Sequence, residues 1–248
     1  MRHHIEHLSS TKMQWKKLSA GVYVKMLNHN MQSGERTGLF HFVPEEGAAP
    51  PNISHYHSIS EELFILDGRM TFDHQTWLGK YAYVYHPPFL VHGFNSSIPV
   101  PTTFIGRSNN DLDFNYPDNS KASKPYYIQG KPAPRGLAHL NFRPETEWEP
   151  LLSPVGQEIG QQNILSQDPR TKEGSKLIRF HKGSKFPERP QGYEFCNEGF
   201  ILEGRVEAED GTVWEKGDYW HRHPGKRVQR LEILKQTLVF STETLPDA

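Results

Sequence analysis

Two short segments of this chain are nearly identical. Residues 62–69 read Glu-Leu-Phe-Ile-Leu-Asp-Gly-Arg, and residues 198–205 read Glu-Gly-Phe-Ile-Leu-Glu-Gly-Arg. Further matches follow in the same order and at a near-constant separation along the chain, namely Gly79-Lys-Tyr81 with Gly217-Asp-Tyr219 and His86-Pro87 with His223-Pro224. Such self-similarity predicts two copies of one structural unit. The repeat therefore restricts the chain to folds in which two similar domains follow each other.

The composition predicts that both copies are built from β-strands. The chain of 248 residues contains 20 Gly and 19 Pro, and 12% of its residues are aromatic. Apolar runs at 38–43, 81–85 and 237–240 have the length and composition of strands, and turn-forming residues separate them. In small barrels, alternate residues of each strand point inward. We therefore expect an all-β fold with two barrels.

The domain limits follow from the repeat. We expect an N-terminal barrel over residues 1–110 and a C-terminal barrel over 146–248. The segment between them, 111–145, is rich in Pro, Asn, Asp, Ser and Lys, which indicates an ordered linker or a strap over one barrel. Within it, Tyr126, Tyr127 and Ile128 could add an edge strand, whereas 117–125 has the composition of a disordered segment.

Charge and cysteine content exclude several classes of protein. The net charge is −1 with no basic stripe, which argues against a nucleic-acid partner. No apolar run approaches the roughly 18 residues that a membrane-spanning helix needs, and the N-terminus lacks the apolar core of a signal peptide. A single cysteine, Cys196, permits no intramolecular disulfide and suits a reducing compartment. We expect a cytoplasmic protein with neither a nucleic-acid nor a membrane partner.

A metal site is predicted by histidines near the first repeated segment. His55 and His57 are separated by one residue, so a strand would direct both to the same face. Glu61 follows four positions later, and His92 comes after Gly79 and a pair of prolines. Imidazoles and carboxylates are ligands of divalent transition metals. The alternative is that the three histidines are ordinary core residues.

Comparison of the two copies favours a metal site in the first, because the second copy keeps the fold signals but lacks the histidines. The counterparts of His55, His57, Glu61 and His92 are Gln191, Tyr193, Asn197 and Gln229. None of these is a good transition-metal ligand, although Glu188 or Glu194 could shift into the second site. Glu62 is matched by Glu198 in that copy, so Glu62 is expected to be structural and Glu61 to be the ligand. One metal per chain, in the N-terminal barrel, is therefore expected.

The pattern H-x-H-(x)3-E-(x)6-G, followed by G…PP…H, resembles the two motifs of the cupin superfamily. The resemblance implies two tandem cupin barrels, which are double-stranded β-helices or jelly rolls, and one divalent ion (Fe, Mn, Ni or Zn) held by His55, His57, Glu61 and His92. The layout is most similar to uncharacterised bicupins and to the ChrR-like cupin group. Two positions depart from the motif, because Pro87-Pro88-Phe89 replaces a Pro-x-Gly turn and Ser96 replaces an asparagine.

Three functions stay open at this point. The first is a metal-dependent dioxygenase-type oxidoreductase that acts on a small organic substrate. Aromatic residues around the motif suit this function if they line an apolar cavity; the alternative is that they form the ordinary core of the barrel. The second is a hydrolase, isomerase or decarboxylase that needs no O2, for which Glu62 and His41 are the weak candidates for a catalytic residue. The third is a small-ligand-binding or sensing module without turnover. Exposed strand edges are compatible with a homodimer.

Overall fold

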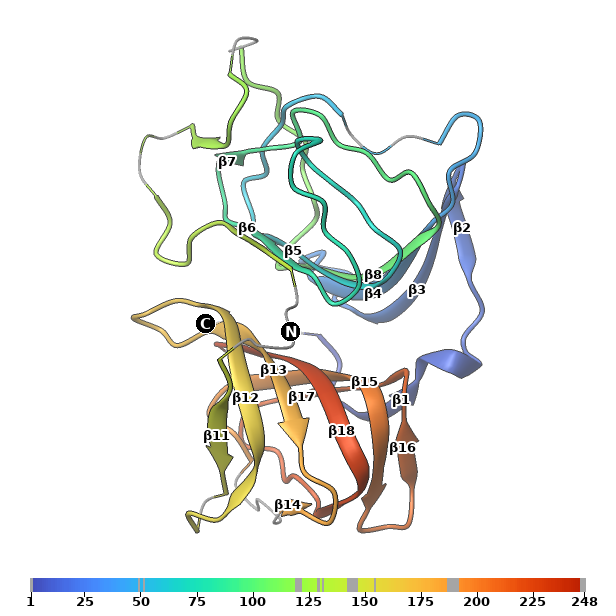
Figure 1. The fold of residues 1–248 in the computed structure, drawn as a ribbon, viewed down its shortest axis with the longest axis vertical. Helices are drawn as coiled ribbons and strands as arrows, with labels where there is room; N and C mark the ends of the chain where they lie inside the picture. The colour runs from blue at the N-terminus through green and yellow to red at the C-terminus, as the bar shows by residue number, and fades with distance from the viewer. Residues whose placement is uncertain are drawn as a thin grey trace. The chain divides into compact units, whose positions relative to one another are not determined.

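The protein is almost entirely β-structure in a computed structural model, which describes residues 2–48, 50, 52–118, 122–128, 130, 132–141, 147–153, 155–186 and 192–245 (Figure 1). Within these residues there is no α-helix, only a 3-10 turn at Ser10–Lys12 (η1). The all-β prediction is confirmed. No described helix has the length and apolar character needed to cross a membrane.

The chain divides into two compact units. We call the described residues between Gln14 and Asn141, with Arg2, the N-terminal unit. The C-terminal unit contains His3–Met13 and the described residues from Glu147 onward. The predicted first domain, 1–110, thus differs from the structure at its start, since residues 3–13 lie with the C-terminal unit.

The N-terminal unit is built on an antiparallel sheet with the strand order β10-β6-β5-β8-β4-β3-β2. Its strands are β2 (Lys16–Ser19), β3 (Val22–His29), β4 (Arg36–Phe42), β5 (Glu61–Asp67), β6 (Tyr83–His86), β8 (Thr102–Ser108) and β10 (Ala138–Leu140). A smaller sheet pairs β7 (Leu90–Val91) with β9 (Tyr126–Tyr127). Alternate residues of the strands, such as Leu63 and Ile65 of β5, pack in one apolar core.

The segment at 111–145 contributes to the N-terminal unit through both of its strands. The predicted edge strand forms as β9, and β10 extends the main sheet by pairing His139 with Val84 of β6. Part of the range with a disordered composition, 119–121, lies outside the described residues. The segment therefore adds sheet edges to one unit.

The C-terminal unit has a second antiparallel sheet, with the order β1-β17-β15-β18-β13-β12-β11, while β14 pairs with β18 and β16 with β15. Its strands are β1 (Ile5–Ser9), β11 (Glu149–Leu152), β12 (Glu158–Gln167), β13 (Gly174–Phe180), β14 (Lys185–Phe186), β15 (Cys196–Ala208), β16 (Val213–Glu215), β17 (Asp218–Arg222) and β18 (Leu231–Thr244). The first strand of the chain pairs with β17, with Ile5 opposite His221. This pairing accounts for the different domain limit.

Both units contain the same turn at the end of the repeated segment. Gly68 and Gly204 have positive φ angles of 83° and 105°, which glycine adopts without strain. A threonine hydroxyl lies beneath each turn and accepts a hydrogen bond from the next residue's N–H, over 3.1 Å for Arg69 to Thr102 and 3.1 Å for Arg205 to Thr237. The matching glycines thus have matching structural roles.

The strand register corrects one detail of the sequence alignment. Glu61 lies opposite His86 in the β5–β6 pair, and Asn197 lies opposite Arg222 in the β15–β17 pair. The structural counterpart of His86 is therefore Arg222, and not His223 as the His-Pro match predicts. A short sequence match cannot fix register to one residue, because a bulge or an extra turn residue shifts it.

The turn before His92 also has a counterpart. Phe89 and Gly225 both have positive φ, at 62° and 70°. Their N–H groups donate to the carbonyls of His57 (2.7 Å) and Tyr193 (2.9 Å). Phe89 thus occupies a backbone conformation that suits glycine, and His57 matches Tyr193 as expected. Gln191, the expected counterpart of His55, lies outside the described residues.

Candidate metal centre

Three histidines converge inside the N-terminal unit. His55 and His92 form an antiparallel backbone bridge, with N···O distances of 3.0 and 2.8 Å. His57 lies two residues after His55, so its side chain follows on the same face. All three residues are buried, and one ring nitrogen from each lies within 4.8 Å of the others. The structure therefore brings together the three histidines that the spacing predicts.

Backbone carbonyls fix the orientation of each ring. The Nδ1–H of His55 donates to the Ile53 carbonyl over 2.7 Å, and that of His92 donates to Leu90 over 3.0 Å. His57 makes the same contact with the carbonyl of Asp113. A neutral imidazole that donates from Nδ1 has its lone pair on Nε2, and metal-ligating histidines are commonly held in this way. All three rings are thus set to present Nε2.

The Nε2 atoms of His57 and His92 are buried and have no hydrogen-bond partner among the described residues. A buried polar atom without a partner costs roughly 1–3 kcal/mol. Two such atoms beside each other would be destabilising unless a cation accepts both lone pairs. The site therefore fits a metal ion with imidazole ligands.

Glu61 completes the same group from the start of β5. Its Oε2 atom lies 3.5 Å from Nε2 of His92 and 4.0 Å from Nε2 of His57. Two ligand atoms at about 2.1 Å from one ion are roughly 3–4 Å apart. Burial acts to raise the pKa of Glu61, but its hydrogen bond with His86 and the proximity of His92 outweigh burial and hold the pKa well below its usual value. Glu61 is thus an anionic ligand candidate at neutral pH.

Two further histidines, His86 and His139, form a hydrogen-bonded chain that ends on the carboxylate of Glu61. His86 Nδ1 lies 2.9 Å from Glu61 Oε2, and His86 Nε2 lies 2.8 Å from Nε2 of His139. The carboxylate only accepts, so His86 donates from Nδ1 and uses the Nε2 lone pair to accept from His139. Glu61, His86 and His92 also have ligand spacing, but both nitrogens of His86 are already engaged. His86 therefore positions Glu61.

Sequence reasoning treats His86 only as a fold signal and does not identify His139. The signal for His86 was available, because it precedes the proline pair by one residue and lies in the strand next to Glu61. His139 reaches the site from β10, a sheet-edge strand far along the chain that has no motif of its own.

Replacing His86 with phenylalanine should weaken metal binding without removing a ligand. The ring volume is kept, but Glu61 loses the hydrogen bond that fixes its carboxylate. Loss of an outer-shell partner of this kind typically costs about 10–100-fold in metal affinity. Competition with a chelating dye measures the change. Retention of full affinity would show that His86 does not position Glu61.

The metal-free protein should lose stability as the pH falls from about 6.5 to about 4. Burial lowers the pKa of His55 and of His139 from 6.5 to about 4. In this window the unfolded chain binds more protons than the folded one, so the free energy of unfolding decreases as the pH falls. Urea denaturation at a series of pH values tests this, and His139→Gln should flatten the curve. A profile that is flat between pH 6.5 and 4 would contradict the expectation.

The site opens into a cavity of about 310 Å³. His55, Glu61 and His92 line it, so whatever they bind can be reached from the cavity. The rest of the wall is mainly apolar and includes Phe40, Phe42, Phe72, Phe104, Phe114, Leu63, Met70 and Ile98, and parts of Arg36 and Arg107 also line it. Phe40 and Phe42 belong to the apolar run at 38–43 that the sequence predicts to be a strand.

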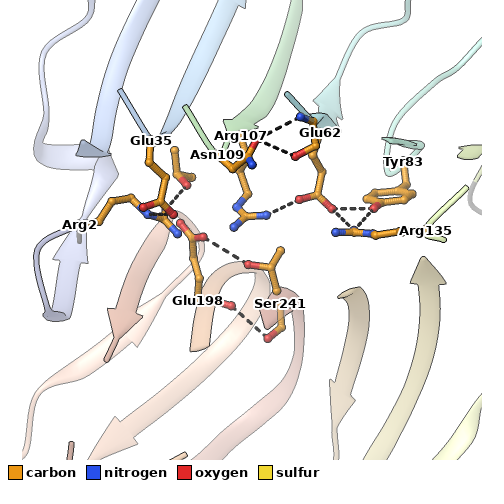
Figure 2. A network of polar contacts seen from close by, with 12 residues as sticks. Arg2, Glu35, Glu62, Tyr83, Arg107, Asn109, Arg135, Glu198 and Ser241 are labelled. Carbon is orange, nitrogen blue, oxygen red and sulfur yellow. Dashed lines mark hydrogen bonds and ion pairs between the residues drawn. The ribbon is translucent and has the colours of Figure 1, made fainter. Parts of the chain in front are cut away.

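The two weak catalytic candidates, Glu62 and His41, are not among the described residues that line this cavity. Glu62 is buried on the other face of β5, where Arg107 and Arg135 donate to its carboxylate and the Tyr83 hydroxyl donates over 2.6 Å (Figure 2). His41 lies beside Thr103, with Nδ1 at 2.8 Å from the hydroxyl oxygen. Glu62 thus has the structural environment that its match with Glu198 predicts.

Comparisons with known proteins agree with this fold. Residues 4–108 match the family model of the ChrR cupin-like domain. No curated protein matches the sequence. Among solved structures, a candidate dioxygenase from Nostoc punctiforme PCC 73102 has a TM-score of 0.75 at 13% identity, over 98% of this chain and 87% of that chain.

Two named enzymes have the same fold at greater structural distance. A mutant of salicylate 1,2-dioxygenase from Pseudoaminobacter salicylatoxidans has a TM-score of 0.54 at 14% identity, over 84% of this chain and 70% of that chain. A formate complex of Lactobacillus farciminis oxalate decarboxylase has a TM-score of 0.57 at 9% identity, over 98% and 87%. The family match over residues 4–108 and these structural likenesses show that the chain has the cupin fold.

Proposed function

We propose that the protein is a metal-dependent cupin enzyme that carries out a dioxygenase-type oxidation of a small organic substrate. The observation that carries the proposal is the pair of buried Nε2 atoms, from His57 and His92, that lack partners among the described residues and lie beside a carboxylate at the wall of an apolar cavity. His55, His57, His92 and Glu61 would hold the ion. The three Nδ1 contacts with backbone carbonyls keep these rings in place before the ion binds.

Fe(II), Mn(II), Ni(II) and Zn(II) all accept these ligands, so the donor set does not select one of them. A bound ion would supply Lewis-acid polarisation of a substrate oxygen and, if it is redox-active, chemistry with O2. The phenylalanines of the cavity would bind the apolar part of the substrate and exclude water. Arg36, which also lines the cavity, would orient an acidic substituent.

A second candidate is an O2-independent reaction on the same metal centre, such as decarboxylation, hydrolysis or isomerisation. The observation that favours it is the presence of Arg36 in the cavity wall, since a guanidinium group suits a carboxylate substrate. The fold likeness to oxalate decarboxylase fits this alternative as well.

Oxygen uptake with small aromatic and aliphatic acids separates the two candidates. The dioxygenase proposal expects O2 consumption in step with product formation, and no turnover without O2. Turnover at an unchanged rate under anaerobic conditions would contradict it in favour of the second candidate. Saturable binding with no product after long incubation would contradict both and indicate a sensing module.

We also infer that the two units are copies of one ancestral cupin barrel, and that only the N-terminal copy kept a metal centre. The shared features are the Gly68 and Gly204 turns and the Phe89 and Gly225 turns. A third is a buried carboxylate that accepts from a tyrosine, Glu62 from Tyr83 and Glu198 from Tyr219. Under this inference the protein is a bicupin that binds one metal ion per chain.

A further inference from the structure

The C-terminal unit has a cavity of about 320 Å³, similar in volume to the cavity beside the metal centre. Its wall is largely aromatic and aliphatic, with Phe180, Tyr193, Trp214 and Trp220 among the larger side chains. The polar residues that line it are Lys176, Asn197, Arg222, Ser241 and Glu243. An apolar cavity with a few polar groups is the usual form of a small-molecule site.

Arg222 is the unusual residue of this wall. It ends β17 opposite Asn197, and it is only 2% exposed. Its Nε atom lies 3.2 Å from a carboxylate oxygen of Glu6, whereas its Nη2 atom is buried without a hydrogen-bond partner among the described residues. Its guanidinium also lies near the rings of Trp214 and Trp220, at 5.6 and 5.4 Å from their centroids. A buried cation with an unpaired donor is costly unless something else satisfies it.

Asn197 offers a second donor beside Arg222. The indole N–H of Trp220 donates to Oδ1 of Asn197 over 2.8 Å. Because an indole N–H can only donate, this contact fixes the amide oxygen toward Trp220 and turns the NH2 group the other way. The other cation of the wall, Lys176, is paired with Glu243 at 2.9 Å. The polar groups that stay available around this cavity are therefore the hydrogen-bond donors of Arg222 and Asn197, and Arg222 carries a positive charge.

We propose that this cavity is a second ligand site, which binds an organic monocarboxylate with an aromatic or branched apolar body. The carboxylate would accept from Arg222 and Asn197, since guanidinium–carboxylate contacts are strong and geometrically matched. The apolar body would lie against Trp214, Trp220 and Phe180. Arg222 stands where the metal-binding copy has His86, and Asn197 stands where it has Glu61. The C-terminal unit would thus bind an anion at the position where the N-terminal unit would bind a metal cation. This proposal does not depend on the reaction proposed for the N-terminal unit.

Calorimetric titration of the full-length protein with benzoate tests this proposal, with benzyl alcohol as the uncharged counterpart. We expect saturable benzoate binding and much weaker binding of the alcohol. Arg222→Met keeps the side-chain length without the charge and should weaken benzoate binding by roughly 10–100-fold, as expected for loss of a hydrogen bond to a charged group. Arg222→Lys keeps the charge without the planar fork and should give an intermediate affinity.

His57→Ala is the matched control, because it removes a metal ligand of the other unit and should leave this benzoate site intact. Unchanged affinity in the folded Arg222→Met and Arg222→Lys variants would overturn the proposal. Loss of all binding in His57→Ala would also overturn it, since benzoate would then occupy the metal-site cavity. Absence of saturable binding to the wild-type protein at millimolar benzoate would overturn it as well.

Discussion

Replacing His57 with alanine is expected to lower the affinity of the protein for Zn(II) by more than about 100-fold, which exceeds the usual effect of losing an outer-shell group. The Nε2 atom of His57 is buried and has no other partner among the described residues. Its ring is anchored through Nδ1 to the Asp113 carbonyl, an arrangement that a substitute ligand from a neighbouring side chain would not reproduce. Competition between metal-free protein and a chromophoric zinc chelator measures the affinity directly.

His41→Ala is the matched control for this experiment. His41 is a partly buried histidine of the same unit, but it lies beside Thr103 and is not among the described residues that line the cavity of the metal centre. Its replacement should leave the zinc affinity unchanged. Equal affinities for His57→Ala and the wild-type protein would contradict the assignment of His57 as a ligand.

Replacing Glu62 with alanine is expected to reduce the free energy of unfolding by about 3–5 kcal/mol, the usual cost of removing one partner from a buried ion pair. Glu62 is 3% exposed and accepts from Arg107, Arg135 and the Tyr83 hydroxyl (Figure 2). Without the carboxylate, two largely buried guanidinium groups lose the anion between them. Urea denaturation followed by tryptophan fluorescence measures the loss.

The adjacent carboxylate provides the contrast. Glu61→Gln should lower metal affinity and change the stability of the metal-free protein far less, because the carboxylate of Glu61 faces the imidazoles of His57, His86 and His92. Glu62→Ala should have the opposite profile, with metal content retained in the folded fraction. Loss of metal from folded Glu62→Ala, or a large loss of stability in metal-free Glu61→Gln, would reverse the two assignments.

The parts of this protein that depend on local patterns were predictable from the sequence. Alternation along the strands places His55 and His57 on one face, and the comparison with Asn197 separates Glu61 from its neighbour Glu62 as a ligand candidate. The glycine turns were predictable for the same reason, since positive φ at Gly68 is a property of one residue and its neighbours.

Features that depend on distant pairing were not predictable. β1 joins β17 from the opposite end of the chain, and no local signal in Ile5–Ser9 indicates this partner. His139 and Arg135 belong to the segment at 111–145, where no recognisable spacing marks them. They nevertheless contact His86 and Glu62 in the N-terminal unit. The equivalence of His86 and Arg222 also depends on the register of two strand pairs. A shift of one residue in either pair would move every side chain of the strand to the other face of the sheet.

The most direct test of the account is elemental analysis of the wild-type protein, purified without added metal and compared with His55→Ala. The account predicts one divalent transition-metal ion per wild-type chain and none in the variant, since among the described residues only the N-terminal unit presents such a group of histidines with Glu61. The same measurement identifies which metal the protein binds. Two ions per wild-type chain, or the same metal content in His55→Ala, would contradict a single metal centre at these residues.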